Sequence, residues 1–290
     1  AEFLDGVRID VPRGVHWSSP VEVLWVHTEA DRPTQQHSRV LVVAADGSAA
    51  TIVERHLGLG SQPYLSTAVT EVLTGRDATV RHVKIQDEGP AATHFATLVM
   101  KPGHGANVES HVVSLGSATQ RTAVHALFTE PNAECRLNGV FAAAEQQSLD
   151  HYTVIDHAVG GCTSHELYRG VVADSAIGSF IGRVLIGVGA TGSSTNQLAA
   201  VLLLGDNASA NAKPQLEIDN DDVIASHGAA IGQLDAEALF YLRARGISEA
   251  QARGLLIEGF VKQVLSSVPV EGLADILSER ILARVERAAA

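Results

Sequence analysis

The feature that most constrains this chain is a long series of short β-like segments with no helical pattern between them, extending over residues 7–218. Each segment either alternates apolar and polar residues or forms a short apolar block. The separators are rich in Gly, Asn, Asp and Pro, which end strands and form turns. Such a series predicts a β-sandwich, a β-barrel or a β-solenoid. The expected strands cover residues 7–11, 21–27, 40–43, 50–54, 65–72, 79–86, 92–100, 107–115, 121–129, 135–141, 149–155, 164–172, 182–188 and 198–204.

Three properties of the series favour the solenoid. The chain has 290 residues, more than most single sandwiches use. The segments recur at similar spacing, and small residues are spread through them, which suits closely stacked coils. Aromatic residues make up only 4% of a chain that is 46% hydrophobic, so the core must consist of Val, Leu, Ile and Ala. No crisp repeat motif is present, so the pattern alone leaves the sandwich and the barrel open.

The pattern changes to helical spacing after Gly232. A first helix is expected to end at Gly246, and Ser248 with Gln251 is typical of a helix capping box. Pro269 should end the second helix, and a third is expected over residues 273–285. We therefore expect a β domain over residues 1–232 and a helical domain over residues 233–290. Three short helices cannot bury all their apolar faces, so part of this surface should meet the β domain or another protein.

Charge and cysteine content exclude several classes of function. The net charge is −12, with 33 acidic and 21 basic residues, which argues against binding to nucleic acid or to anionic membranes. No apolar segment reaches the ~18 residues of a membrane helix, and no basic-then-apolar signal segment begins the chain. We expect a cytoplasmic protein. Cys135 and Cys162 form no CxxC pair and are expected to be reduced thiols.

One histidine, His227, lies at the junction of the two patterns and is followed by Gly228. We expect it at a strand-to-helix corner, where an imidazole could ligate a metal or move a proton. The alternative is that His227 only caps this corner by hydrogen bonding, and the residues by themselves favour that alternative.

The other candidate motifs carry weaker signals. His157 and the pair His165-Glu166 form the tightest histidine cluster, with His151 nearby, and His151 and His157 would share one face of an unbroken strand. There is no HExxH spacing, so surface or core histidines are the better interpretation. Residues 187–192 match GxGxxG but no helix follows, so turns explain these glycines. The chain contains neither GxSxG nor a Walker motif.

Several blocks of the sequence resemble the SufB/SufD family of iron–sulfur cluster assembly, and its SufD branch in particular. The strongest is SHGA at residues 226–229 together with the segment from Gly232 to Ile247. The others are DGVRIDVPRGV at residues 5–15, SRVLVV at 38–43, TIVE at 51–54, LYRGVV at 167–172, GRVL at 182–185 and KPQLEI at 213–218.

The resemblance implies a right-handed parallel β-helix followed by a helical domain. It implies a non-catalytic scaffold that pairs with a SufB-like paralogue through the β-helix ends. A SufC-like ABC ATPase would dock on the C-terminal helices, especially residues 239–260. The complex would assemble a nascent iron–sulfur cluster, with His227 as a ligand at the interface. No cluster is expected to be tightly bound to the isolated chain.

The chain departs from the family pattern at three places. Ala225 occupies a position at which the family often has cysteine, so any role of that thiol is lost. Residues 189–197, GATGSSTNQ, lack the more charged loop of the family. The family's helical N-terminal region is missing, which predicts a truncated or short variant. SufB-type proteins have cysteine where His227 stands, which favours the SufD branch.

Two other hypotheses compete with the scaffold. A solenoid enzyme could use His157, His165 and Glu166 on a small or polymeric substrate, although no paired acids along a groove can be identified. A β-solenoid homodimer could act as a binding module, because pairing of the coil ends would cover the open strand edges.

Overall fold

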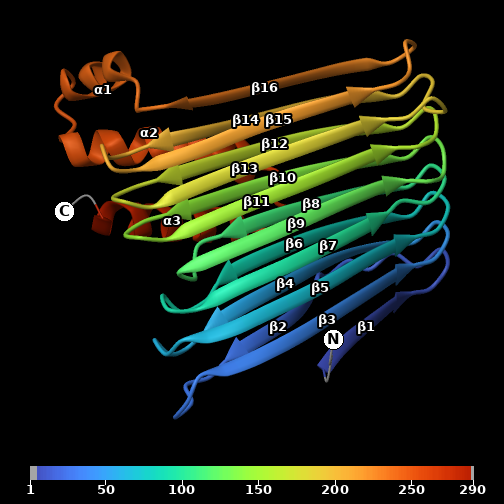
Figure 1. Ribbon diagram of the computed structural model, residues 1–290, viewed down its shortest axis with the longest axis horizontal. Helices are drawn as coiled ribbons and strands as arrows, with labels where there is room; N and C mark the ends of the chain where they lie inside the picture. The colour runs from blue at the N-terminus through green and yellow to red at the C-terminus, as the bar shows by residue number, and fades with distance from the viewer. Residues whose placement is uncertain (1–4, 289–290) are drawn as a thin grey trace.

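The computed structural model describes residues 5–288, which form a parallel β-helix followed by three helices (Figure 1). The solenoid and the C-terminal helices predicted from the sequence are thereby confirmed. The strands are β1 (Asp5–Val11), β2 (Val21–His27), β3 (Thr34–Ala44), β4 (Ala49–Gly58), β5 (Tyr64–Thr74), β6 (Thr79–Asp87), β7 (Thr93–Lys101), β8 (Asn107–Ser114), β9 (Thr119–Phe128), β10 (Glu134–Ala143), β11 (Ser148–His157), β12 (Thr163–Val172), β13 (Ile177–Ile186), β14 (Ser194–Leu203), β15 (Ser209–Ile218) and β16 (Ile224–Gly232).

The strands form two sheets that enclose one core. Odd-numbered strands make up one sheet and even-numbered strands the other, and every strand pairs in parallel with the strand two places along the chain. Each coil therefore gives one strand to each sheet, and consecutive strands lie on opposite sides of the core. The turn at Asp46-Gly47 passes from one sheet to the other and closes no hairpin, since β3 and β4 belong to different sheets.

Alternation along each strand builds the core. In β5 and β11 every second side chain is buried, and the buried positions stack on buried positions of the neighbouring coils. Valine, isoleucine, leucine and alanine dominate the buried apolar residues, as the composition predicted. Two of the few buried aromatic rings lie opposite glycine residues, which leave space for them. Tyr168 on β12 lies in register with Gly139 on β10, and Gly170 lies in register with Phe141.

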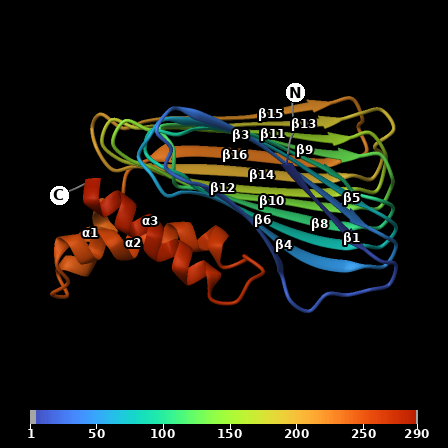
Figure 2. The ribbon, with the colours of Figure 1, turned by 90° about the horizontal axis from the view of Figure 1, so that it is seen from below.

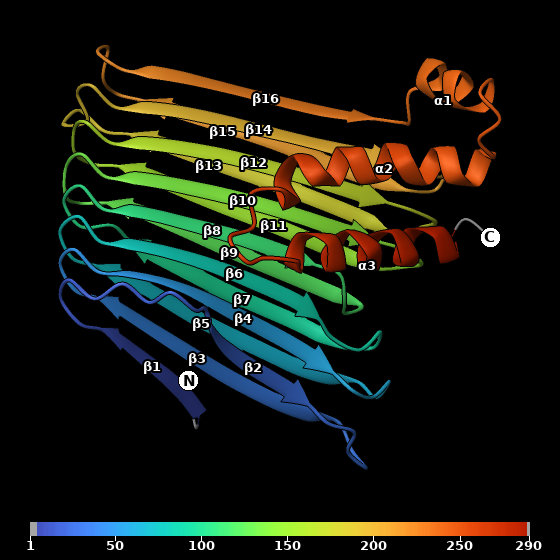
Figure 3. The ribbon, with the colours of Figure 1, turned by 180° about the vertical axis from the view of Figure 1, so that it is seen from behind.

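The three helices are α1 (Ala236–Arg243), α2 (Glu249–Leu265) and α3 (Leu273–Ala288). Gly246 has φ +88° after the first helix, and Gln251 donates its backbone N–H to the Ser248 hydroxyl, as the capping signals predicted. Helices α2 and α3 cover the outer face of the even-strand sheet (Figures 2 and 3). Ile257, Val261 and Leu277 pack there in one apolar cluster with residues of β8, β10 and β12. The division into domains 1–232 and 233–290 stays a prediction.

Replacement of Gly139 by alanine should destabilise the chain. A Cβ at Gly139 would collide with the ring of Tyr168, which is fully buried and cannot move aside. Overpacking of this kind costs about 1–3 kcal/mol. Urea unfolding should show a lower midpoint for Gly139→Ala. Gly232→Ala is the matched control, because a Cβ there meets no atom within 4 Å. Equal midpoints for the two variants would contradict the packing argument.

Candidate functional site

The candidate site lies at the last coil of the solenoid, formed by β15 and β16. These strands are the final members of their sheets, so one edge of each has no neighbouring strand among the described residues (Figure 1). An unpaired edge offers a row of free backbone N–H and C=O groups to another chain. The apolar residues Ile218, Ile224 and Ile231 are all exposed at this end. The last coil thus combines open backbone with exposed apolar side chains.

His227 lies in the middle of β16, so the prediction of a strand-to-helix corner is wrong. The strand continues to Gly232, and α1 begins only at Ala236. The segment after His227 is small and mixed, GAAIG, and its sequence shows no clear alternation. Pairing with β14 extends this segment as a strand, with Gln197 opposite His227 and Leu202 opposite Gly232.

The side chain of His227 continues a column on the inward face of the even-strand sheet. In successive coils the column contains His82, Ser110, Leu137, Glu166, Gln197 and His227. The first five are buried, whereas His227 is exposed because no further coil follows among the described residues. Neighbouring strands are about 4.8 Å apart, so His227 lies directly over Gln197. The imidazole of His227 is therefore the inward-facing group that lies exposed at the open end of the solenoid.

The polar groups below His227 are only partly satisfied. Gln197 donates its side-chain N–H to the Glu166 carboxyl group, and Oε1 of each residue is buried without a hydrogen-bond partner. Burial raises the pKa of Glu166 to about 7, against the smaller opposing effect of the hydrogen bond from Gln197. Glu166 is therefore substantially protonated at neutral pH, two coils below the open end.

Ala225 shares the inward face with His227. It is paired with Thr195, whose side chain is buried, and it packs against the core. Two residues along a strand span about 7 Å, so a side chain at this position would lie near the imidazole. A methyl group occupies the position where the resemblance implied a thiol.

The histidine cluster suggested by the sequence is not brought together in one cleft. His151 and His157 share the inward face of β11, as predicted, but six residues of strand place them about 20 Å apart. Burial lowers the pKa of His151 to about 3 and that of His157 to about 4. His165 is exposed, on the opposite face of β12 from the buried Glu166.

The two cysteines are free and buried, in agreement with the expectation of reduced thiols. Burial raises the pKa of both thiols, and the Glu166 carboxyl adds to the effect at Cys135. Little thiolate forms at neutral pH, so neither residue is suited to nucleophilic chemistry or metal binding.

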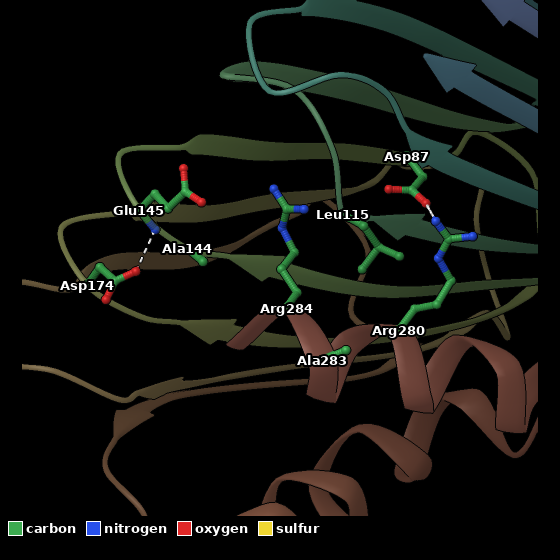
Figure 4. A pocket seen from close by; sticks show the side chains of 8 residues that line it. All are labelled: Asp87, Leu115, Ala144, Glu145, Asp174, Arg280, Ala283 and Arg284. Carbon is green, nitrogen blue, oxygen red and sulfur yellow. Dashed lines mark hydrogen bonds and ion pairs between the residues drawn. The ribbon is translucent and has the colours of Figure 1, made fainter. Parts of the chain in front are cut away.

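A separate pocket lies where α3 meets the turns that follow the even-numbered strands (Figure 4). Arg280 forms an ion pair with Asp87, and Arg284 donates to the side-chain oxygen of Gln147. These contacts fasten α3 to the solenoid. Among residues 5–288, none of the helices combines the length and apolar character needed to cross a membrane.

One group of polar residues was missed by the sequence reasoning. Glu54, His56, Lys84, Glu88 and His94 are buried inside the early coils of the solenoid. The sequence does contain a signal for this group: polar residues occupy inward positions of β4 and β7. Others interrupt the apolar pattern of β6, a strand that is covered on both faces.

The neutral state of Glu166 predicts a specific pH dependence of stability. Its pKa is about 7 in the folded chain and close to 4.3 in the unfolded chain, so stability is lost as the pH rises from about 4.5 to about 7. The loss amounts to about 4 kcal/mol at most. Glu166→Gln should remove this dependence in urea unfolding series between pH 4.5 and 8. Glu279→Gln, at an exposed position of α3, should leave it unchanged. Parallel pH profiles for the wild type and Glu166→Gln would contradict the assignment.

Comparison with known proteins places the chain in a family. The family model described as "SUF system FeS cluster assembly, SufBD core domain" matches residues 26–260. The SufD protein of Escherichia coli is 29% identical over 280 residues, which cover 96% of this chain and 65% of that protein. Bacillus subtilis SufD is 30% identical over 97% of this chain and 64% of its own length. The chloroplastic protein ABCI7 of Arabidopsis thaliana is 31% identical over 93% of this chain and 58% of its own length. The chain thus spans somewhat less than two thirds of these relatives. On the family match and the β-helix together, the chain belongs to the SufBD family of iron–sulfur cluster assembly proteins, and its relatives include SufD proteins.

Proposed function

We propose that this chain is a scaffold subunit of an iron–sulfur cluster assembly complex, with no catalytic activity of its own. It pairs with a SufB-like paralogue through the open end of its solenoid and docks a SufC-like ABC ATPase on its C-terminal helices. The observation that carries the proposal is the exposed His227 on the inward face of an unpaired last strand. We expect the complex to act in the cytoplasm.

The open end suits a partner with a similar solenoid. Free backbone groups on β15 and β16 can continue into the strands of a second β-helix, and the exposed apolar side chains of this end become buried there. The strands of the partner would continue the column of inward side chains and bury His227. The imidazole of His227 would then face the interior of the partner. Pairing therefore creates an enclosed space that neither chain has alone.

His227 supplies one nitrogen ligand to a nascent cluster, which is the cargo of the complex. Imidazole binds iron, and histidine replaces cysteine at some iron–sulfur centres. A single imidazole with Ala225 beside it cannot complete the ligand set of a cluster. The remaining ligands are thiolates of the partner, so the isolated chain holds no cluster tightly.

Helix α1 supports a second interface. None of its residues is buried, and the rings of Phe240 and Tyr241 are exposed on its eight-residue length. A helix this short is marginal without packing, so a partner that covers it would stabilise it. The adjoining α2 also exposes the apolar side chain of Leu255. Residues 239–260 thus present apolar surface suited to the ATPase.

Partner choice can be tested by anaerobic co-expression with the SufB-like and SufC-like proteins of the same source, followed by native mass spectrometry. A heterocomplex that contains this chain is the expected result. The same open end could join two copies of this chain, and a homodimer with neither partner bound would instead favour the alternative binding module. A monomer that binds neither partner would contradict the proposed scaffold function.

His227→Ala should leave the complex assembled but lower its iron and sulfide content by about tenfold or more. Loss even of an outer-shell partner costs a metal site about 10–100-fold in affinity, and the loss of a direct ligand should cost at least as much. Iron and acid-labile sulfide are measured on the purified complex after anaerobic reconstitution. His165→Ala, which removes an exposed histidine from the side of the solenoid, is the control. Unchanged cluster content in His227→Ala would exclude the ligand role.

The double change Phe240→Ser and Tyr241→Ser should weaken binding of the ATPase subunit by about 30-fold or more. One aromatic side chain at the centre of an interface contributes about 2 kcal/mol, or about 30-fold in affinity, so 30-fold is the effect if only one of the two rings is central. Both rings are exposed in this chain, so its unfolding free energy should change little. Isothermal titration calorimetry measures the affinity. Ile276→Ser, at an exposed apolar position on α3 outside residues 239–260, is the control and should bind normally.

A further inference from the structure

The buried polar cluster of the early coils takes no part in the proposed function. It lies on β4, β6, the turn after β6, and β7. Five strand-to-strand steps separate β6 from β16 in the even-strand sheet, a distance of about 24 Å. The cluster is therefore independent of the site at His227.

Glu88 and His94 form its most informative pair. Nδ1 of His94 lies 2.7 Å from Oε2 of Glu88, and Gln86 donates its side-chain N–H to the same oxygen at 3.0 Å. Nε2 of His94 is fully buried and has no hydrogen-bond partner. His94 thus carries an unsatisfied ligand atom inside the core. A cation held by both side chains would take the place of the proton that Nδ1 of His94 and Oε2 of Glu88 share.

His56 adds a second imidazole at the same point. Its ring centroid lies 4.9 Å from that of His94, and the rings meet edge to face. One ligand atom from each of His56, Glu88 and His94 lies within 4.8 Å of the other two. Nε2 of His56 is itself 2.6 Å from Oε1 of Glu54 and 2.8 Å from the Lys84 ammonium, so these two groups orient this ring and leave Nδ1 as its ligand atom. Two imidazoles and one carboxylate are a common ligand set for zinc and for iron(II).

The charge balance also favours a cation. The ionisable groups that face the three residues are Glu54, His82 and Lys84, and the Lys84 ammonium lies 3.0 Å from Oε1 of Glu54. Two buried carboxylates therefore face one ammonium, and an uncompensated buried charge is costly.

Tyr64 contacts both a surface pocket and the turn that carries Glu88. The pocket is lined by His27, Thr34, Gln62 and Tyr64, among other residues. The Tyr64 hydroxyl accepts a hydrogen bond from the backbone N–H of Gly89, the residue next to Glu88. The surface pocket therefore comes close to the cluster at this ring.

We propose that His56, Glu88 and His94 form a binding site for a divalent first-row transition metal ion. The ion stabilises the early coils of the solenoid by joining β4 to β7 across the core.

The test uses Co²⁺ as the probe. The purified chain is treated with a chelator, incubated with Co²⁺ and freed of excess ion by gel filtration. Metal content is measured before chelation and after loading by mass spectrometry, and bound Co²⁺ is detected by its visible ligand-field absorption. We expect one Co²⁺ per chain, a histidine-ligand absorption spectrum and a melting temperature higher than that of the metal-free chain.

Two variants remove ligands, and two serve as controls. Glu88→Gln keeps the shape of the side chain and an oxygen for His94, so it should fold while its affinity for Co²⁺ falls by about 100-fold or more. His94→Gln should behave alike. His111→Gln is the matched control, since His111 is buried 2.8 Å from Glu109 and has an unpartnered Nδ1 but belongs to no three-residue group. His227→Ala is the second control, because it removes the proposed cluster ligand and should leave Co²⁺ binding unchanged.

The outcomes distinguish the hypotheses. Retention of Co²⁺ by the wild type, His111→Gln and His227→Ala but not by folded Glu88→Gln supports the site. Failure of the wild type to retain Co²⁺, or equal retention by Glu88→Gln, overturns it and leaves a hydrogen-bonded polar core. Neither outcome depends on whether the chain joins an iron–sulfur complex.

Discussion

The parallel backbone ladder is the constraint on which the rest of this structure depends. Each strand obtains its hydrogen bonds from the coil before it and the coil after it, so the interior coils are fully paired and the terminal coils are not. A solenoid cannot pair its own last edge unless another element covers it. Helices α2 and α3 pack on the face of the even-strand sheet and leave the β16 edge open (Figure 3). The same ladder that stabilises the chain thereby leaves an edge to which another chain could add a strand.

The ladder also decides what the interior contains. Parallel register stacks equivalent positions in columns, so a polar residue at one inward position has inward neighbours in the next coils. Glu54 shows the consequence, because Lys84 lies opposite it on β6 and forms a buried ion pair. Such pairs add little net stability when compared with apolar residues, but removal of one partner is costly. The polar groups inside this solenoid are therefore coupled to one another and constrain the register of the early coils.

The sequence predicted the solenoid well because turn residues and alternation are local signals. It predicted the stacking poorly because the coils differ in length. The register advances by 26 residues from Thr93 to Thr119 but by 33 residues from Val7 to Val40, which explains the absence of a crisp repeat. Without the stacking, neither the neighbours of His227 nor the meeting of His56 with His94 could be derived. His227 itself was found as a candidate, but its position in the middle of β16 depended on pairing with β14, a tertiary interaction that overrides the weak local pattern.

The column beneath His227 connects the interior with the proposed chemistry at the open end. A cluster held by thiolates and one imidazole brings negative charge to the last coil. An ionised carboxylate two coils below, about 10 Å away, would oppose that charge through a medium of low dielectric constant. Burial already keeps about half of the Glu166 carboxyl groups protonated at neutral pH, and the approach of an anion would raise the pKa further. The protonated carboxyl then presents a neutral hydrogen-bonding group, and Gln197 lies between it and His227. Under the proposed function, the interior below the open end is thus electrically suited to an anionic cargo, for which this chain would supply one ligand.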